Sequence, residues 1–232
     1  MLALLTGATR GIGAAVCRKL LKMGYTTAFL YRNEHTYQAF LSTLSDEEKS
    51  RVWAVQGNLA KPDDITAFSE SLLAEKGLPE TIILNAGVYE GGFPSELSPA
   101  DWATQMQLNF GQAQQSLFPL LPALKARKSG KIILIGTVVT REPRTFAASY
   151  TLSKGLLDQY GRLMADELRG YNIALSRILP GSVNTETWGD AEVPRECFVE
   201  PDDIAGAVEF ILRQRPAVWI EEMVVRPLDK NW

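Results

Sequence analysis

Short apolar runs alternate with stretches of helical periodicity along most of the chain. Runs that lack polar alternation predict buried strands over residues 2–6, 26–31, 52–56, 82–84, 131–135, 173–179 and 223–225. Apolar residues at helical spacing predict helices over residues 12–24, 34–44, 62–76, 101–126, 149–168 and 201–212. Strands that are apolar throughout are buried on both faces, so the alternation predicts a parallel sheet with helices on each side. Right-handed crossovers would make this a Rossmann-type, doubly wound α/β fold.

The chain is predicted to form one domain over residues 1–232, because it contains no internal repeat, low-complexity segment or linker. Residues 182–200 form the one long stretch without a clear element. This stretch leaves the carboxyl end of the sixth predicted strand, where ligands bind in sheets of this type. It is therefore a candidate lid over a substrate.

Composition narrows the classes of function. The 232 residues carry a formal net charge of −3, which argues against a nucleic acid or an anionic membrane as partner. The two cysteines, Cys17 and Cys197, are far apart, which fits a reducing compartment, and we expect a cytoplasmic protein. A single histidine, His35, excludes a multi-histidine metal site, and no metal is expected. No run approaches the ~18 apolar residues of a membrane-spanning helix.

Three glycines lie between the first predicted strand and the first predicted helix, in the segment T-G-A-T-R-G-I-G at residues 6–13. Glycine lets the backbone approach a phosphate closely, and a helix N-terminus offers free N–H groups and a positive dipole. The spacing differs from G-x-G-x-x-G, and an ordinary glycine-rich turn would also fit. The position at the first strand-to-helix junction favours a dinucleotide site that uses Gly7, Thr9, Arg10, Gly11, Ile12 and Gly13.

The end of the second strand bears on the choice of cofactor. An acidic residue there usually binds a free ribose 2′-hydroxyl, but this chain has Tyr31 followed by Arg32. Arg32 and Arg10 could instead pair with a 2′-phosphate, to which a guanidinium group is suited. We therefore favour NADP(H) over NAD(H), although two solvated surface arginines would give the same pattern.

Tyr150 and Lys154 are four residues apart, so they share one face of a predicted helix. A phenol has a reference pKa of about 10, and a nearby ammonium group favours the phenolate and lowers that pKa. Such a pair can exchange a proton with a substrate oxygen. The spacing alone would equally fit a solvated helix face.

Four motifs occur in one order along the chain: residues 6–13, Asn85-Ala86-Gly87, Tyr150-x-x-x-Lys154 and Pro180-Gly181-x-Val183-x-Thr185. Together they resemble the short-chain dehydrogenase/reductase family, and the match covers nearly the whole chain. The resemblance implies a single Rossmann-type domain, a nicotinamide cofactor, and hydride transfer to or from a carbonyl carbon.

The resemblance also implies a role for each matching residue. Tyr150 would be the acid/base, Lys154 would lower its pKa and hold the nicotinamide ribose, and Asn109 would carry a proton-relay water. Thr137 stands where the family usually has a serine and would supply a hydroxyl partner. Asn58 replaces an aspartate that accepts from the adenine amino group. The other implied cofactor contacts, beside Arg32 at the end of the second strand, are Leu59, Asn85, Ala86, Gly87, Pro180, Gly181, Val183 and Thr185.

The implied activity is hydride transfer between NADP(H) and a small-molecule carbonyl or secondary alcohol. A nucleotide-binding redox sensor without turnover remains an alternative, as do epimerisation and dehydration on the same scaffold. Aromatic residues expected near the cleft would form an apolar wall or would simply pack the loops: Tyr89, Phe93, Phe146 and Trp188.

Residues 135–139 look like the corresponding stretch of 3-oxoacyl-carrier-protein reductases, in which case Lys128 and Arg169 could face an acidic carrier protein. The family usually pairs through its two long helices, here expected at residues 101–126 and 149–168. We therefore expect a homodimer or a homotetramer.

Overall fold

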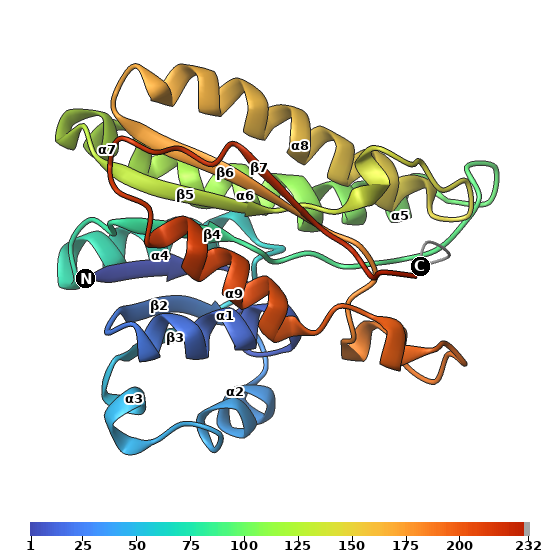
Figure 1. Ribbon diagram of the computed structural model, residues 1–232, viewed down its shortest axis with the longest axis horizontal. Helices are drawn as coiled ribbons and strands as arrows, with labels where there is room; N and C mark the ends of the chain where they lie inside the picture. The colour runs from blue at the N-terminus through green and yellow to red at the C-terminus, as the bar shows by residue number, and fades with distance from the viewer. Residues whose placement is uncertain (230–232) are drawn as a thin grey trace.

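The computed structural model describes residues 1–229, in which seven strands form one sheet with helices on both faces (Figure 1). The order across the sheet is β3-β2-β1-β4-β5-β6-β7, and every neighbouring pair is parallel. This confirms the predicted doubly wound α/β fold. The strands are β1 (Leu2–Leu5), β2 (Thr26–Tyr31), β3 (Val52–Gln56), β4 (Thr81–Leu84), β5 (Gly130–Ile135), β6 (Ile173–Pro180) and β7 (Glu222–Val225).

The core consists of two hydrophobic layers, one on each face of the sheet. On one face the sheet packs against α1 (Gly11–Lys22), α2 (Glu34–Leu41) and α9 (Pro201–Leu212). On the other face lie α4 (Pro62–Glu75), α6 (Gln112–Leu117), α7 (Leu121–Arg127) and α8 (Ala148–Arg169), with α5 (Pro99–Met106) packed against α8. Burial on both faces is the reason that β1 and β4 are apolar without alternation.

The strand order fixes where a ligand can bind. The chain moves outward from β1 to β2 and β3, and then returns to place β4 on the other side of β1. The turns that follow β1 and β4 therefore diverge to opposite faces and leave a crevice at the carboxyl ends of these strands. The glycine-rich segment after β1 and the Asn85-Ala86-Gly87 motif after β4 both lie at this edge.

Two of the predicted helices are wrong in extent. The single helix expected over residues 101–126 is divided into α5, a π-helical turn η1 (Gln107–Gly111), α6, a 3-10 turn η2 (Phe118–Leu120) and α7. Pro119 lies in η2 and Pro122 in α7, and proline lacks the N–H that a continuous α-helix needs. The helix expected over residues 34–44 ends at Leu41, and a separate helix α3 (Asp46–Ser50) follows.

The candidate lid at residues 182–200 has more order than its sequence predicted. It contains two 3-10 turns, η4 (Glu186–Trp188) and η5 (Arg195–Cys197). Its base is closed by a bridge between Val183 and Val199. The indole N–H of Trp188 donates to the carbonyl of Val183 over 2.8 Å, and its ring packs 4.9 Å from that of Phe198. A tryptophan therefore anchors the segment instead of projecting from it.

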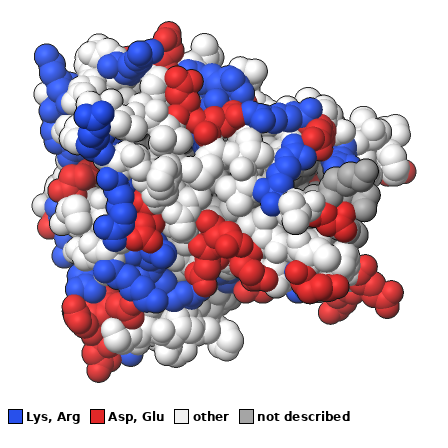
Figure 2. Space-filling view, viewed as in Figure 1, with Lys and Arg blue, Asp and Glu red and all other residues white. Residues whose placement is uncertain are grey.

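The surface shows no single dominant charge on the face viewed in Figure 2, where basic and acidic side chains are interspersed. Across residues 1–229, no helix is both long enough and apolar enough to span a membrane.

Candidate active site

The turn after β1 is shaped for close approach of a ligand. Gly7 has φ +71° and Gly11 has φ +48°, backbone conformations that side chains disfavour. A Cβ at Gly13 would lie 1.8 Å from the carbonyl oxygen of Gly7, so only glycine permits this packing of turn against helix. The turn thus delivers the N-terminus of α1, with its free N–H groups, to the crevice.

The two strand ends at the crevice are joined by side chains. The hydroxyl of Thr6 accepts hydrogen bonds from the backbone N–H groups of Asn85 and Ala86, both over 3.0 Å. The amide of Asn85 donates back to the carbonyls of Thr6 (3.0 Å) and Gly7 (3.3 Å). The Asn85-Ala86-Gly87 motif therefore holds the glycine turn in place, and its Asn85 amide is occupied by protein.

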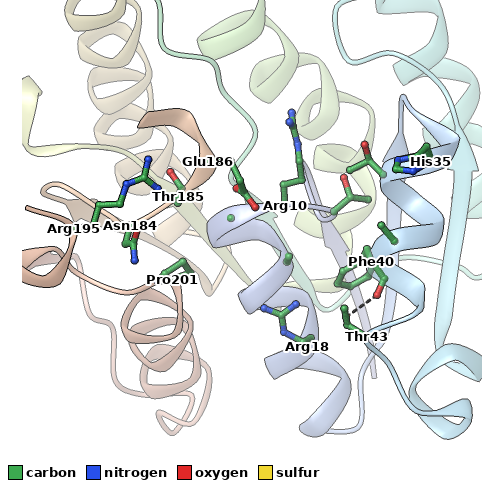
Figure 3. Close-up of a pocket in the computed structure, with 15 residues that line it drawn as sticks. Arg10, Arg18, His35, Phe40, Thr43, Asn184, Thr185, Glu186, Arg195 and Pro201 are labelled. Atoms are coloured by element: carbon green, nitrogen blue, oxygen red, sulfur yellow. Dashed lines mark hydrogen bonds between the residues drawn. The ribbon is translucent and has the colours of Figure 1, made fainter. Parts of the chain in front are cut away.

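A groove of about 590 Å³ opens beside the start of α1 (Figure 3). It brings together Thr9, Arg10 and Gly11 from the glycine turn with Thr185 from the start of the lid. The methyl group of Thr185 lies 3.1 Å from the position that a Cβ on Gly11 would take. Two separate predicted motifs therefore meet at the N-terminus of α1. Ile12 lies in the first turn of α1 and packs against the core on the α1 side of the sheet.

The residues expected near the adenosine lie at the ends of β2 and β3. Arg32 is exposed immediately after β2, where Tyr31 stacks on Tyr37 with ring centroids 4.1 Å apart. After β3, the side-chain oxygen of Asn58 accepts from the backbone N–H of Ala60 over 2.9 Å. One lone pair of the expected adenine acceptor is therefore already used, and a second remains. Leu59 is partly buried against the other core layer.

The end of β6 supplies the last predicted cofactor segment. Pro180 closes β6, and the N–H of Gly181 donates to the carbonyl of Val225 over 2.8 Å. A Cβ on Gly181 would lie 2.8 Å from Pro227, so the lack of a side chain at Gly181 leaves room for the segment that follows β7. Val183 is buried at the base of the lid.

Thr137 and Tyr150 form the centre of the predicted catalytic group. Thr137 follows β5, is buried, and lies close enough to the phenol of Tyr150 for its hydroxyl to influence the pKa of that group. Burial raises the pKa of Tyr150 to about 12, the Thr137 contact lowers it, and the neighbouring Tyr89 raises it further. The rings of Tyr89 and Tyr150 meet edge to face, with centroids 5.1 Å apart. The spacing to Lys154 predicted a lowered pKa, whereas the pKa of Tyr150 is raised because burial disfavours the phenolate.

Lys154 lies one turn further along α8 and is almost fully buried. Its ammonium donates to the carbonyl of Ile135 over 3.4 Å, and burial lowers its pKa to about 8. The Nζ atom lies 3.0 Å from the position of a Cβ on Gly87. Any side chain at Gly87 would displace Lys154, which explains why the motif after β4 ends in glycine.

Asn109 lies inside the π-helical turn η1 and is fully buried. Its side-chain oxygen accepts from the N–H of Val88 over 2.7 Å. Its Nδ2 donates to the carbonyl of Val88 (3.0 Å), to Gln105 Oε1 (2.7 Å) and to Ser153 Oγ (2.9 Å). The predicted proton-relay residue, Asn109, thus links the chain after β4 at Val88 to α8 at Ser153, the residue before Lys154.

Several of these partners were not found from the sequence. Thr6, Gln105, Gln112 and Ser153 all make buried or half-buried hydrogen bonds to predicted site residues; Gln112, for example, donates to the carbonyl of Ala86 over 3.0 Å. Gln105 and Asn109 are four apart, a spacing that could have indicated a shared helix face. The remaining contacts cross between elements far apart in the chain, and no local pattern predicts them.

Comparison with known proteins gives this site its family. Residues 1–195 match the family model described as short chain dehydrogenase. The chain belongs to the short-chain dehydrogenase/reductase family, whose members are oxidoreductases that bind nicotinamide cofactors.

Individual relatives extend over nearly the full chain. An acetoacetyl-CoA reductase of Synechocystis is 25% identical, over 95% of this chain and 92% of that protein. A metagenomic short-chain oxidoreductase in complex with NADP is 31% identical, with a TM-score of 0.83 over 99% of this chain and 98% of that one. An alcohol dehydrogenase of Thermococcus sibiricus, complexed with 5-hydroxy-NADP, is 25% identical, with a TM-score of 0.88 over 98% and 96% of the two chains.

Proposed function

We propose that this protein is an NADP(H)-dependent carbonyl reductase or alcohol dehydrogenase with Tyr150 as its acid/base. The observation that carries the proposal is the placement of the Thr137 hydroxyl beside the Tyr150 phenol, one helical turn from the buried Lys154 and at the same sheet edge as the glycine turn. Two hydroxyl groups and an ammonium group at the carboxyl end of β5 are what a carbonyl oxygen needs as it gains charge.

The residues present fit a dinucleotide. Gly11 and Gly13 free the N-terminus of α1 for a pyrophosphate, and Thr185 stands beside it. Arg32 follows the end of β2, and Arg10 precedes α1 and lines the groove together with His35 and Thr36; both arginines would bind a ribose 2′-phosphate, a preference supported by the NADP in the metagenomic relative. Bound there, the cofactor would supply or accept the hydride. The remaining contacts would come from Asn58, Leu59, Asn85, Ala86, Gly87, Lys154, Pro180, Gly181 and Val183.

The protein's own residues would manage the proton. Thr137 and Tyr150 would hold the carbonyl oxygen, and Tyr150 would donate its phenolic proton as that oxygen becomes an alkoxide. A phenol of pKa about 12 is protonated at neutral pH, which suits the acid role in carbonyl reduction. Lys154, with a pKa of about 8, would carry a proton at neutral pH and stabilise the phenolate that forms. Asn109 would keep the chain after β4 against Lys154.

Cofactor consumption tests the proposal against the sensor alternative. Purified protein is mixed with NADPH and a panel of ketones, aldehydes, sugars and acyl thioesters, and NADPH oxidation is followed. We expect turnover with at least one carbonyl class and none in the Tyr150→Phe protein. Tight NADPH binding without oxidation by any member would favour a sensor. Conversion of a substrate without net NADPH oxidation would favour epimerisation or dehydration.

A 3-oxoacyl thioester is the second candidate substrate, favoured by the similarity to an acetoacetyl-CoA reductase. Both predicted carrier-protein contacts are exposed, but they differ in their surroundings. Lys128 is exposed at the end of α7 with φ +54°, whereas Arg169 lies over the ring of Trp219, 5.6 Å from its centroid. A lower KM for a carrier-bound 3-oxoacyl group than for the same group on a short thiol would support this candidate.

We further propose a single domain over residues 1–232, of which the last three lie outside the described residues. A cytoplasmic location, supported by the free Cys17 and Cys197, is part of the same proposal. Assembly as a homodimer or homotetramer is supported by exposed leucines on one face of α8, namely Leu152, Leu156 and Leu163. Leu157 and Met164 face the core instead.

A further inference from the structure

Two polar pairs lie along the interface between α5 and α8. These helices belong to successive crossovers, β4 to β5 and β5 to β6, on the same face of a parallel sheet, so they run in the same direction. The bond between Asn109 Nδ2 and Ser153 Oγ joins the two helical segments. Gln105 precedes Asn109 by four residues and Ser149 precedes Ser153 by four, so each lies one turn earlier on the same side of its helical segment.

Gln105 and Ser149 are both fully buried, and each leaves one atom unsatisfied. Gln105 Oε1 accepts from Asn109, but Gln105 Nε2 has no hydrogen-bond partner among residues 1–229. Ser149 Oγ also has none there. Buried polar groups without partners are costly and rare, and one buried water between an unpartnered donor and an unpartnered hydroxyl group would satisfy both.

The orientation of Gln105 matters for the active site because a side-chain amide has nearly the same shape either way round. With its oxygen toward Asn109, Gln105 binds the Nδ2 of that residue and leaves the Asn109 oxygen for the N–H of Val88. The Asn109 oxygen lies 2.9 Å from the position that a Cβ on Gly87 would take, and Lys154 Nζ lies 3.0 Å from the same position. If the Gln105 amide were reversed, its Nε2 would lie against Asn109 Nδ2, and two donors would face each other. Asn109 would then lose the bond that orients it, and the chain after β4 would no longer be held through Val88.

We propose that Gln105 is a positioning residue for this active site, and that it shares a buried water with Ser149. The water holds Gln105 Nε2 away from Asn109, and Gln105 Oε1 then fixes Asn109, Val88 and the backbone beside Lys154. The effect on turnover rests on the proposed carbonyl-reducing function. The shared water does not.

Kinetics test the positioning role. Gln105→Leu keeps the approximate shape and removes the acceptor, so kcat should fall roughly 10- to 100-fold, as expected for a small misplacement of reacting groups. The dissociation constant of NADPH should stay within about twofold. Gln105→Glu should recover most of the rate at about pH 6, because a buried carboxyl group is protonated there and keeps an oxygen acceptor.

Gln107→Leu is the matched control. It removes a side-chain bond of similar length on the same helical run, from Gln107 Nε2 to Gln115 (3.0 Å), without touching Asn109. Its kcat should stay near that of the wild type. If Gln105→Leu also keeps wild-type kcat while the wild type reduces carbonyls, the positioning role is wrong and the proposed function stands.

Two further measurements need no turnover, so they decide the inference even if the wild type reduces no carbonyl and the proposed function fails. By NMR, hydrogen exchange of the Asn109 side-chain amide should be at least about tenfold faster in Gln105→Leu; unchanged exchange would overturn the positioning role. Melting temperatures are compared for Gln105→Leu, Ser149→Ala and the double variant. Loss of either partner should release the same water, so the double variant should melt close to the less stable single variant. Additive shifts would overturn the shared water.

Discussion

The hydroxyl of Thr137 lies beside the phenol of Tyr150 and lowers the pKa of that phenol, which burial raises. Thr137 comes from the end of β5 and Tyr150 from the first turn of α8, so the two meet only in the folded sheet. If both hydroxyls hold the substrate oxygen, Thr137→Ser should retain activity within about threefold. Thr137→Val keeps the shape without the donor and should lower kcat roughly 10²-fold, the usual cost of one oxyanion donor.

Thr140→Val is a control for the threonine series, because the Thr140 hydroxyl donates only to the backbone carbonyl of Thr137, over 3.0 Å. Steady-state kinetics on the three variants separate the two roles. Near wild-type turnover in Thr137→Val would mean that Thr137 packs the site without taking part in the chemistry.

The pH dependence should follow Lys154. Its pKa of about 8 lies below the reference value because burial disfavours the ammonium form. The ammonium is therefore present below about pH 8 and is lost as pH rises, while Tyr150 stays protonated up to about pH 12. For carbonyl reduction, kcat/KM for NADPH should be level below about pH 8 and fall up to about tenfold per unit above it. A profile that is level to pH 10 would contradict this assignment.

Removal of Lys154 gives an independent check on that profile. Lys154→Met should lower both turnover and NADPH affinity, because it removes the charge beside the phenol and a predicted ribose contact. The alkaline fall should also vanish from any residual activity. Persistence of the same fall would assign it to another group.

Cofactor choice should depend on Arg32. Arg32→Asp would place a carboxylate beside a 2′-phosphate, so NADPH affinity should drop roughly 10- to 100-fold while NADH affinity changes little. Lys22→Asp is a control with the same change of charge, because Lys22 is exposed in the last turn of α1, is not among the residues that line the groove, and should leave the ratio of the two affinities unchanged. Fluorescence titration with both cofactors measures the ratios. Equal losses for NADPH and NADH, or a wild type that prefers NADH, would refute the assignment.

Assembly should depend on the exposed face of α8. Leu163 is 72% exposed, and Leu163→Glu should shift a dimer or tetramer toward smaller species because a charge would be buried at the contact. Phe210→Glu on α9, where the side chain is 51% exposed, tests the opposite face of the sheet. Light scattering at micromolar concentration reports the mass. A wild type that is monomeric, or a mass unaffected by Leu163→Glu, would place the contact elsewhere or exclude it.

Sequence reasoning located the parts of the fold and site that local patterns determine. Uninterrupted apolar runs predicted the seven strands, and the spacing of four predicted that Tyr150 and Lys154 share a helix face, as they do on α8. The divided helix was missed because helical periodicity alone does not show where a π-turn such as the one around Asn109 forms. The α3 helix was missed although Ser45 and Glu48 form a capping box that the sequence displays.

The rest of the site depends on contacts between distant segments. Gln105 is a helix residue in the sequence, and only the folded structure shows that its amide oxygen accepts from Asn109 and that α5 packs on α8, the helix that carries Ser149. The pKa of Tyr150 is a similar case. The spacing to Lys154 predicted a lowered value, whereas the depth of burial, which no local pattern gives, raises it.

The most direct test of the account is single-turnover kinetics of the Tyr150→Phe protein. This variant keeps the ring, the helix and the edge contact with Tyr89, and it removes the hydroxyl group that carries the transferable proton. With a carbonyl substrate found for the wild type, the rate of NADPH oxidation should fall roughly 10²- to 10⁴-fold, the usual share of general acid catalysis. The dissociation constant of NADPH should stay within about twofold. A rate within threefold of the wild type would contradict the central claim that Tyr150 is the acid.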